Sequence, residues 1–470
     1  MPAHEASWKD SLANLTRATH IPELRNRLLF VAGMFALFVL GLHVPAPFVN
    51  PAAIEKLASN GVLGFIDIMS GGAFKRLSIL ALGIVPYINA SIIMQLLGIA
   101  VPSIQRMQKE GETGRKILSS YTRWGTVFLA LLQGIGLGVL LLNQPDAVDT
   151  STLGVFAVVP LIMVMAAGTS FLMWVGEQLT DRGIGNGISL IIFAGIIIRL
   201  PSTFKQIFDL AIAQSGANAA FGIMRILVIV LIFVLIVVFI TFVHQATRQI
   251  PIQHAKRVVA NRVFNSANTY LPLKVVTAGV IPIIFAISLV MLPATIAQFL
   301  APKFPNSTAL EVMRMLSPGY SGTLLSWGPI PLGSTTITIP FGAVLGGLLY
   351  FLLVVFFTYF YTAVVYNVQD IADNLKKHGS FVPGLRPGKQ TEHYIDQVLT
   401  RITFAGALFL GVVALLPYII PAILGGNNGG ANYFPLWGGT SLLIVVGVAL
   451  ESMKQLEAHL VMRHYEGFIK

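Results

Sequence analysis

The sequence contains no cysteine and, for its length, few charged residues. Cysteine is absent from all 470 residues, which excludes disulfide bonds and thiolate metal sites. Only 11% of the residues are charged and 55% are hydrophobic, whereas a soluble chain carries about 25% charged residues. The composition therefore indicates an integral membrane protein.

Signatures of enzymes are also missing. The sequence has no HExxH, GxSxG or GxxxxGK[ST] pattern, so no metalloprotease, serine hydrolase or P-loop nucleotide site is indicated. The glycine-rich run at 183–187 lacks the GxGxxG spacing and opens an apolar segment instead of following a strand. We therefore expect no enzymatic activity, no catalytic residue, no metal and no cofactor. If energy is used, we expect another protein to supply it.

Ionisable side chains are absent from the centre of every long apolar segment and occur only near segment ends. Ion-coupled transporters bury such groups to bind their ions, so this class is disfavoured. The segments do contain the amides Asn89, Gln95, Gln133 and Asn186. Two roles fit these amides equally well, namely hydrogen bonding between helices and lining of a transport pathway.

Ten apolar segments can each hold a membrane-spanning helix of about 20 residues. They lie at about 28–45, 77–101, 123–142, 154–176, 184–200, 221–243, 275–300, 339–366, 402–422 and 437–453. Ten crossings put both ends of the chain on one side of the membrane, and that side carries 23 of the 31 Lys and Arg residues. The positive-inside rule then places both termini in the cytoplasm and accounts for most of the net charge of +11.

The same segments suggest how the chain is divided. We expect a cytoplasmic N-terminal segment, an N-terminal half with five spans, an external connection, a C-terminal half with five spans and a cytoplasmic tail. Their bounds are 1–27, 28–200, 201–220, 221–453 and 454–470.

The stretch 62–102 differs from an ordinary membrane anchor. Residues 63–74 are apolar, but Asp67 and the glycine pair at 71–72 interrupt them, so this piece is too short to cross a bilayer. A full span, expected at 77–101, follows and carries Pro86 in its interior. Irregular backbone at membrane depth is tolerated only where protein or a water-filled cavity surrounds it. The stretch therefore predicts a cavity within the membrane.

A weak internal repeat supports this interpretation. The six residues 83–88, GIVPYI, resemble the six residues 279–284, GVIPII. They lie in the second and seventh spans, which hold the same place in two successive sets of five. Because five is odd, the second set enters from the opposite side, and matched proline-containing spans in inverted halves point to a pathway at their interface. A match this short also arises by chance in glycine-rich apolar sequence.

Two large basic loops lie on the predicted cytoplasmic side, at 244–274 and 367–401. Positive-inside charge on solvated loops explains most of their Lys and Arg. Both loops, however, mix aliphatic and turn residues with the charge, and the Ile-Pro-Ile run at 250–252 is typical of a short extended piece. Such loops can present a fixed shape to a soluble partner, so we favour a docking surface.

With these features the sequence resembles the SecY family, the channel subunits of the bacterial protein-conducting translocon. The resemblance covers nearly the whole chain. Its most specific blocks are SGGAFKR (70–76), ALGIVPYINASIIMQLL (81–97), GEQLTDRGIGNGIS (176–189), IPIQHAKR (250–257), ADNLKKHGSFVPGLRPGKQT (372–391) and GGTSLLIVV (438–446).

The resemblance implies an all-α fold, in which ten transmembrane helices form two inverted five-helix halves, as a clamshell around a central hourglass pore with a plug half-helix. It implies the plasma membrane of a bacterium as the location. The implied partners are the small membrane subunits SecE and SecG, the SecA ATPase, translating ribosomes through their RNA, signal peptides, unfolded precursor chains and membrane lipids.

Site residues follow from the resemblance by position. The implied pore ring is Ile84, Ile88, Ile188, Ile192, Ile284 and Ile444. The implied plug is Leu63, Gly64, Phe65, Ile66, Asp67, Ile68, Met69, Ser70, Gly71, Gly72, Ala73 and Phe74. A collar of branched aliphatic side chains cannot hydrate an ion, so it blocks small solutes by dewetting.

The resemblance also implies a lateral gate between spans two and seven, with spans three and eight assisting. Asn89, Gln95 and Gln133 are candidates for the polar groups that hold this gate closed. In the loops, the implied contacts with the motor or the ribosome are Arg248, Lys256, Arg257, Arg262 and Arg386.

The sequence thus favours a passive protein-conducting channel, which moves unfolded chains outward and releases apolar segments sideways into lipid. The motive force would come from a bound ATPase or a translating ribosome. The alternative is an inverted-repeat transporter of small solutes, which would need binding groups near the membrane centre that this sequence lacks. An intramembrane enzyme or insertase would need a catalytic dyad or a charged groove, and the sequence shows neither.

Overall fold

The computed structural model describes most of the chain. The described residues are 21–50, 67, 70–144, 147–148, 154–213, 219–254, 258–259, 262–263, 269–300, 304, 307–316, 326–332, 335–423 and 439–466.

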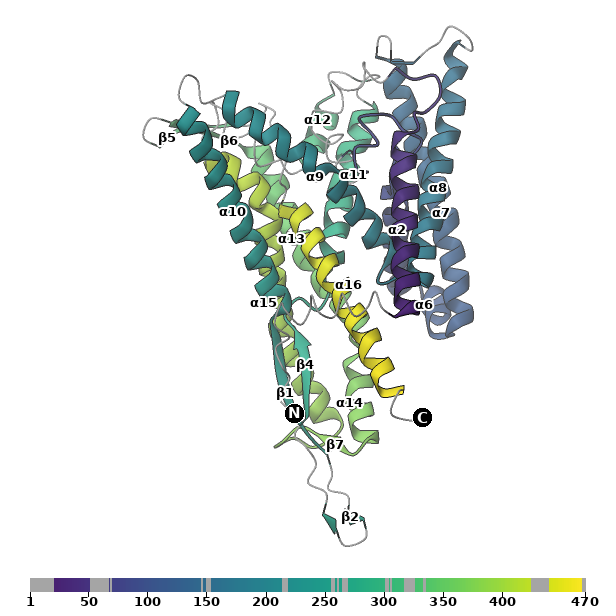
Figure 1. Ribbon diagram of the computed structural model, residues 1–470, viewed down its shortest axis with the longest axis vertical. Coiled ribbons are helices and arrows are strands. Elements are labelled where there is room, and N and C mark those ends of the chain that lie inside the picture. Colours follow the sequence, from purple (N-terminus) through teal and green to yellow (C-terminus); the bar gives the residue numbers. More distant parts are fainter. Residues whose placement is uncertain are drawn as a thin grey trace.

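The described chain is mostly helical (Figure 1). A 3-10 turn, η1, spans Gly154–Ala157. The α-helices are α2 (Pro22–His43), α5 (Val85–Ala100), α6 (Pro102–Lys109), α7 (Glu112–Leu142), α8 (Val158–Arg182), α9 (Gly187–Ala213), α10 (Ala219–Gln245), α11 (Ile281–Leu300), α12 (Thr308–Met315), α13 (Phe341–Val365), α14 (Val368–Lys377), α15 (Lys389–Ile423) and α16 (Gly439–Glu466).

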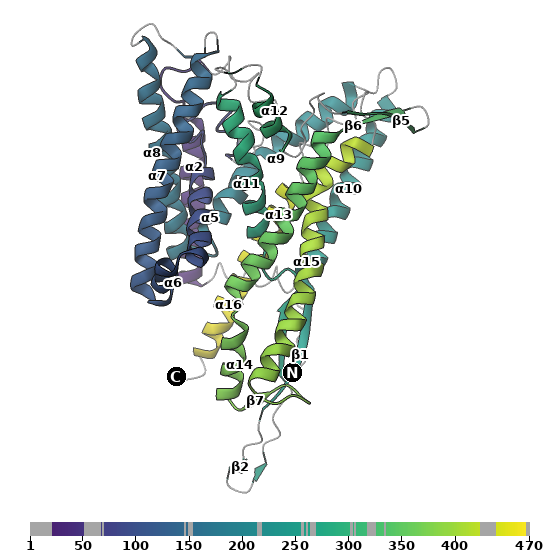
Figure 2. The same ribbon diagram turned by 180° about the vertical axis from the view of Figure 1, so that it is seen from behind.

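Most of the long helices form two groups, and α9, α11 and α16 lie between these groups. One group contains α2, α5, α7 and α8, and the other contains α10, α13 and α15 (Figures 1 and 2). Between the groups, α11 packs against α5 and α7 on one side and against α13 on the other. Likewise α9 packs against α8 and also against α10 and α16. The halves therefore meet along α5, α9, α11 and α16.

Each of the ten expected spans coincides with a helix, although the helices differ in length. Within the described residues, eight helices are long and apolar enough to cross a membrane alone. A ninth span results if α5 and α6 count as one broken span, bent by 104° at Val101. The apolar part of α11, Ile281–Ala297, is shorter. Length and composition thus do not establish ten crossings, and that number stays a prediction.

The second helix begins later than the sequence suggested. The span was expected from residue 77, but residues 77–84 form turns and α5 starts at Val85. Gly83 adopts a φ of 58°, a left-handed conformation that glycine accepts without strain. Pro86 lies in the first turn of the helix, where its missing N–H removes no helical hydrogen bond. Pro86 therefore starts the helix and does not interrupt it.

The repeated motif has the same local structure in both halves. Gly279 has a φ of 62°, and α11 starts two residues later with Pro282 as its second residue. In both halves a left-handed glycine precedes the proline by three residues, and the proline opens a helix. The two helices that enter the interface between the halves thus begin in the same way.

In the described part of the chain, three small β-sheets depart from the expected all-helical fold. They form in connecting segments, where backbone groups that no helix satisfies pair between strands. The strands are β1 (Thr247–His254), β2 (Val258–Val259), β3 (Arg262–Val263), β4 (Thr269–Lys274), β5 (Ser326–Leu332), β6 (Thr335–Pro340) and β7 (Ser380–Phe381). The largest sheet has the order β4-β1-β7, with antiparallel pairing of β1 to both neighbours. The extended piece expected at 250–252 is confirmed as part of β1.

The beginning of α2 and the C-terminal part of α16 lie together. Leu24, Ile184 and Leu456 form a small buried cluster, and Arg27 Nη1 donates to the Gly183 carbonyl at 3.4 Å. In Figure 1 this end of the helices faces the same side as α14 and the β4-β1-β7 sheet. The two described ends of the chain are thus on one side.

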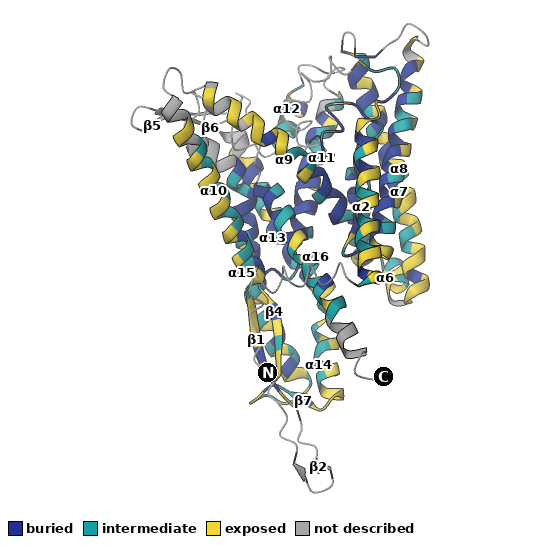
Figure 3. Ribbon diagram, in the orientation of Figure 1, coloured by how far each residue is buried: buried dark blue, intermediate teal, exposed yellow. Residues whose placement is uncertain are grey.

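Exposed residues lie along the outer faces of the two groups (Figure 3), and many of them are large and apolar. On α10, for example, Leu227, Leu231, Leu235 and Phe242 are each at least 59% exposed. A soluble monomer rarely exposes so large an apolar surface. These faces are suited to contact with lipid.

Candidate channel between the two halves

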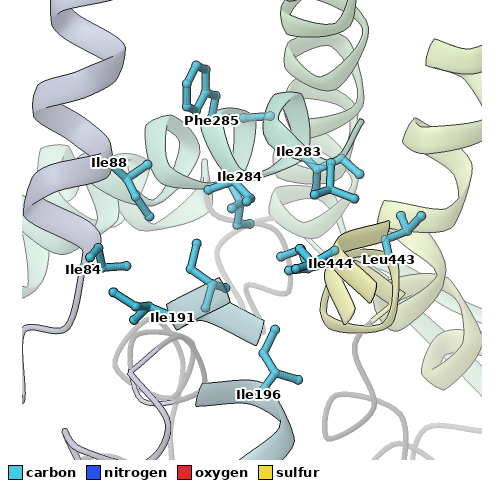
Figure 4. Packing of buried hydrophobic residues seen from close by; sticks show 14 of the residues in the cluster. Ile84, Ile88, Ile191, Ile196, Ile283, Ile284, Phe285, Leu443 and Ile444 are labelled. Carbon is cyan, nitrogen blue, oxygen red and sulfur yellow. The ribbon is translucent and has the colours of Figure 1, made fainter. Parts of the chain in front are cut away.

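A cluster of buried aliphatic residues fills the place where the halves meet. Its members come from helices of both halves, among them α5, α9, α11 and α16, and they include five of the six residues expected in the pore ring. These five are at most 4% exposed, and Ile188 packs against them from α9. They are Ile84, Ile88, Ile192, Ile284 and Ile444. In Figure 4, Ile84, Ile284 and Ile444 point toward a common centre from the residue before α5, from α11 and from α16.

The chemistry of the expected pore ring within this cluster is uniform. The six side chains expected in the ring are all isoleucine, so none of them offers a hydrogen bond or a charge to a bound molecule. A Cβ on Gly176 of α8 would overlap the Ile188 side chain, so this glycine leaves room for Ile188 at the edge of the cluster. The cluster can therefore exclude water and ions, while its contacts are non-directional.

Part of the expected plug lies directly beside this cluster. Asp67 and residues 70–74 are described, whereas residues 63–66 and 68–69 lie outside the described residues. Ala73 belongs to the central cluster, and Phe74 belongs to a second buried cluster within the N-terminal group of helices. The described part of the plug thus joins the central cluster to the N-terminal half.

The backbone of the described part of the expected plug is held by polar contacts around Asp67. Its Oδ1 accepts a hydrogen bond from the Lys75 backbone N–H at 2.7 Å. Its carbonyl accepts from the Gly72 N–H at 2.8 Å and from Ser70 Oγ at 3.2 Å. Its Oδ2 lies 2.7 Å from Arg199 Nη1 in α9. One buried carboxylate therefore fixes the turn and also ties it to another helix.

The interface expected to form the lateral gate is closed by packing. A Cβ on Gly136 of α7 would overlap the ring of Phe299 of α11. Asn89 is buried, and Gln133 is half-buried. Gln95 Nε2 donates to Ser91 Oγ within α5 at 3.2 Å, and its buried Oε1 has no hydrogen-bond partner. Since this bond stays within one helix, the role of the three amides at the gate remains a prediction.

The residues expected to dock a partner are described only in part. Arg248 in β1 and Arg386 are exposed. The Arg386 backbone is fixed, because its N–H donates to Gln390 Oε1 at 3.3 Å and its carbonyl accepts from Thr391 Oγ1 at 2.9 Å. Lys256 and Arg257 lie outside the described residues, and of Arg262 only the backbone, in β3, is described.

The structure joins the two large basic loops into one surface. His254 of β1 contacts Thr269 Oγ1 through Nε2 at 2.7 Å and Ser380 Oγ through Nδ1 at 2.6 Å. Ser380 belongs to the second loop, where β7 pairs with β1. No sequence pattern indicated this connection, because loops carry no periodicity that reveals which strands pair.

Sequence reasoning also missed the pairing of Asp67 with Arg199. A signal was present, because an acidic and a basic residue each stand next to long apolar stretches, where unpaired charges are costly.

Comparison with known proteins agrees with this architecture. The sequence model of the SecY family matches residues 78–453. The chain belongs to the SecY family. It is 40% identical over 478 residues to the protein translocase subunit SecY of Streptomyces scabiei, covering 98% of this chain and 100% of that protein. It is 41% identical over 463 residues to the protein of the same name from Thermotoga maritima, covering 96% of each.

Three solved structures share the fold at lower identity, and each comparison covers 92% of this chain and 91% of the other. One, titled as the structure of a protein conducting channel, gives a TM-score of 0.64 at 20% identity. A second, in which the plug domain of SecY is said to stabilise the closed state, gives 0.59 at 19%. The third, Sec61 in a canine ribosome–channel complex, gives 0.59 at 18%. At these identities the likeness shows the fold.

Proposed function

We propose that this protein is a protein-conducting channel of a bacterial plasma membrane. The observation that carries the proposal is the buried cluster that contains the isoleucines of the expected pore ring, called the isoleucine cluster below. Both halves contribute to it at the point where they meet. Membership of the SecY family supports it, since two relatives are named translocase subunits. An unfolded chain would pass between the halves, with both termini of the channel in the cytoplasm.

The cluster is the seal in this proposal. Branched aliphatic side chains exclude hydrated ions at rest, because a narrow apolar constriction loses its water. They form no specific bond with a passing polypeptide, so they accept any sequence. When a chain enters, the isoleucine side chains lose contacts with one another and gain contacts with that chain. The net change in buried apolar surface is therefore small.

The second route leads sideways into lipid. In this proposal α5 and α7 separate from α11, which opens the interface that Gly136 and Phe299 close at rest. An apolar signal helix can then replace α11 as a packing partner and leave through the gap. Apolar side chains cover the outer helix faces, so an emerging apolar segment meets lipid directly.

Energy and targeting come from partners. We place the SecA motor and the ribosome on the surface formed by β4-β1-β7 and the turn at Arg386, since both arginines named above are exposed there. Contact with ribosomal RNA would be pairing with phosphates and therefore weakens as salt rises. The SecE and SecG subunits would cover part of the exposed apolar outer faces. No enzymatic activity is assigned to the channel itself.

A transporter of small solutes is not favoured. Such a protein binds its solute through a few convergent polar groups near the membrane centre. In the part of the chain that the structure describes, the meeting point of the halves is instead filled by apolar side chains.

Reconstitution tests the proposal. The chain is placed in proteoliposomes with SecE, and SecA, ATP and a precursor with a signal sequence are added. We expect ATP-dependent protection of the precursor from external protease, and no protection of the same precursor without its signal. Absence of protection with an active motor and correctly oriented channels would refute the proposal.

A further inference from the structure

The plug segment is tied by charge to a helix that contacts both halves of the protein. We propose that Asp67 and Arg199 form an ionic latch, which holds the plug against α9 and sets how readily the resting channel opens. The inference rests on the proposed function, because it concerns the closed state of the proposed channel.

The geometry of the pair is that of a buried contact. Asp67 Oδ2 and Arg199 Nη1 are 2.7 Å apart, and the two side chains are 3% and 23% exposed. The Nη1 atom is buried and makes no hydrogen bond within the described residues. The carboxylate of Asp67 is therefore the group that compensates its charge there. Without Asp67, a buried part of the guanidinium would be left uncompensated, which is costly in an apolar environment.

A close approach of two glycines accompanies the ion pair. A Cβ on Gly71 would lie 3.0 Å from the Cα of Gly195. Gly195 precedes Arg199 by four residues in α9, so both lie on the same face of that helix. The absence of a side chain at Gly195 brings the plug segment against α9, where the arginine reaches the carboxylate. Two adjacent contacts thus define one seat for the plug.

The position of α9 links the latch to movements between the two groups of helices. This helix packs against α8 of the N-terminal group and against α10 and α16 of the C-terminal group. Because α9 also packs against the C-terminal group, a movement of that group pulls on α9, and with it on Arg199, while Phe74 anchors the plug segment in the N-terminal group. Because the attraction falls with distance and is weakened by water, separation of the pair lowers the cost of moving the plug further. When the halves close, the same attraction guides the carboxylate back.

A second ion pair provides the matched control. Arg123 Nε donates to Glu177 Oε1 at 2.8 Å, and these side chains are 54% and 21% exposed. This pair joins α7 to α8 and does not involve the plug. Neutralising Glu177 removes one carboxylate charge from an ion pair, as at Asp67, but leaves the plug seat intact.

The test is a double-mutant cycle read as ion conductance of the resting channel in planar bilayers, measured per inserted channel. The variants are Asp67→Asn, Arg199→Gln, the double variant, and Glu177→Gln as control. Asparagine keeps the acceptor for the Lys75 N–H, so Asp67→Asn removes the charge with little change of shape. We expect each single variant to raise resting conductance about threefold or more, because removal of the latch shifts the population toward open states.

The double variant distinguishes a latch from two separate effects. If the residues act through each other, the double variant conducts about as much as one single variant, whereas independent effects would multiply. Glu177→Gln should conduct like the wild type. Unchanged conductance in Asp67→Asn, or multiplication in the double variant, overturns the latch. If Asp67→Asn does not accumulate, Arg199→Gln alone carries the test, and unchanged conductance there overturns it.

Translocation separates this inference from the proposed function. All four variants should still protect a precursor with an intact signal, and the two single plug-seat variants should also protect more of a precursor with a weakened signal. Equal use of the weakened signal by Asp67→Asn and the wild type contradicts the latch, even if the intact precursor is transported. Failure of the wild type to transport the intact precursor contradicts the proposed function instead.

Discussion

The isoleucine cluster and the plug seat lie side by side, yet they are built from opposite kinds of contact. The cluster consists mainly of buried aliphatic side chains that helices of both halves contribute. The plug seat depends on a carboxylate, an arginine, backbone hydrogen bonds and a glycine–glycine approach. The first kind of contact is non-directional, and the second requires defined partners at defined distances.

This difference matches two different tasks in a closed channel. A seal that must close around any chain cannot use contacts that need a particular partner. A plug that must return to one position needs such contacts, because they distinguish that position from its neighbours. Variants that weaken the contacts of one region at a time therefore test whether the cluster acts as the seal and the plug seat positions the plug.

The largest effect is expected at the seal. Ile84→Ser together with Ile88→Ser places two hydroxyl groups in the cluster, where both isoleucines are at most 4% exposed. Water can then enter the constriction, and we expect the resting ion conductance to rise about tenfold or more. Single-channel recording in planar bilayers measures it.

The control for the seal uses the outer surface. Leu231 and Leu235 of α10 are each 59% exposed. Their joint replacement by serine makes the same kind of change away from the cluster and should leave the conductance unchanged. An equal rise in both double variants would show that general loosening, and not loss of the seal, admits the ions.

The next effect is expected at the plug seat. Gly71 and Gly72 both have positive φ values, 72° and 88°, but a Cβ on Gly71 meets Gly195 at 3.0 Å, whereas one on Gly72 has no neighbour closer than 3.9 Å. Both alanine variants thus carry similar backbone strain, and only Gly71→Ala also pushes the plug from α9. We expect about a threefold higher resting conductance for Gly71→Ala than for Gly72→Ala, because only the first shifts the plug equilibrium.

Equal conductance in these two glycine variants would contradict the close approach as the determinant of the seat. The comparison is informative only if both proteins reach the membrane in similar amounts, which quantitative immunoblotting establishes.

A smaller effect concerns the docking surface, which lies outside both regions. Arg386→Glu reverses an exposed charge on a fixed turn. We expect ATP-dependent translocation to be slowed by roughly two- to threefold through weaker motor binding, with unchanged resting conductance. Arg115→Glu makes the same change at an exposed position of α7 and should have little effect. Similar slowing by both variants would assign the effect to net charge and not to the turn.

The smallest effect is expected at the gate. Gly136→Ala introduces a methyl group against the Phe299 ring and so weakens the contact between α7 and α11. We expect about a twofold gain in transport of a precursor with a weakened signal, because the open gate becomes more populated. Gly33→Ala in α2 is the control, since a Cβ there meets nothing within 4 Å. A gain in both variants, or in neither, would argue against the glycine contact at the gate.

Much of this architecture follows from the sequence, because bilayer thickness imposes long apolar segments that composition reveals. The paired motifs at Gly83 and Gly279 also indicated which helices meet at the interface, and the structure gives both glycines the same left-handed conformation. The start of α5 was misplaced, because residues 77–84 are apolar and hydropathy cannot distinguish turns packed in protein from helix.

Contacts between distant segments were beyond the sequence. The ion pair of Asp67 with Arg199 and the bridge from His254 to Ser380 join residues far apart in the chain. Neither pair follows a period of 2 or 3.6 residues, which is the signal that sequence analysis uses. The positions of charged residues indicated that they need partners, but only the packing of α9 and the pairing of β1 with β7 identify these partners.

The most direct test of the account is to locate a polypeptide during transport. A precursor fused to a tightly folded domain is arrested in the reconstituted channel, and a photoreactive amino acid replaces Ile84, Ile284 or Leu231 of the channel, one at a time. We predict crosslinks to the arrested chain from the two cluster positions, one directly before α5 and one on α11, and none from Leu231 on the outer face of α10. Crosslinks from Leu231 without crosslinks from Ile84 and Ile284 would contradict a path between the two halves.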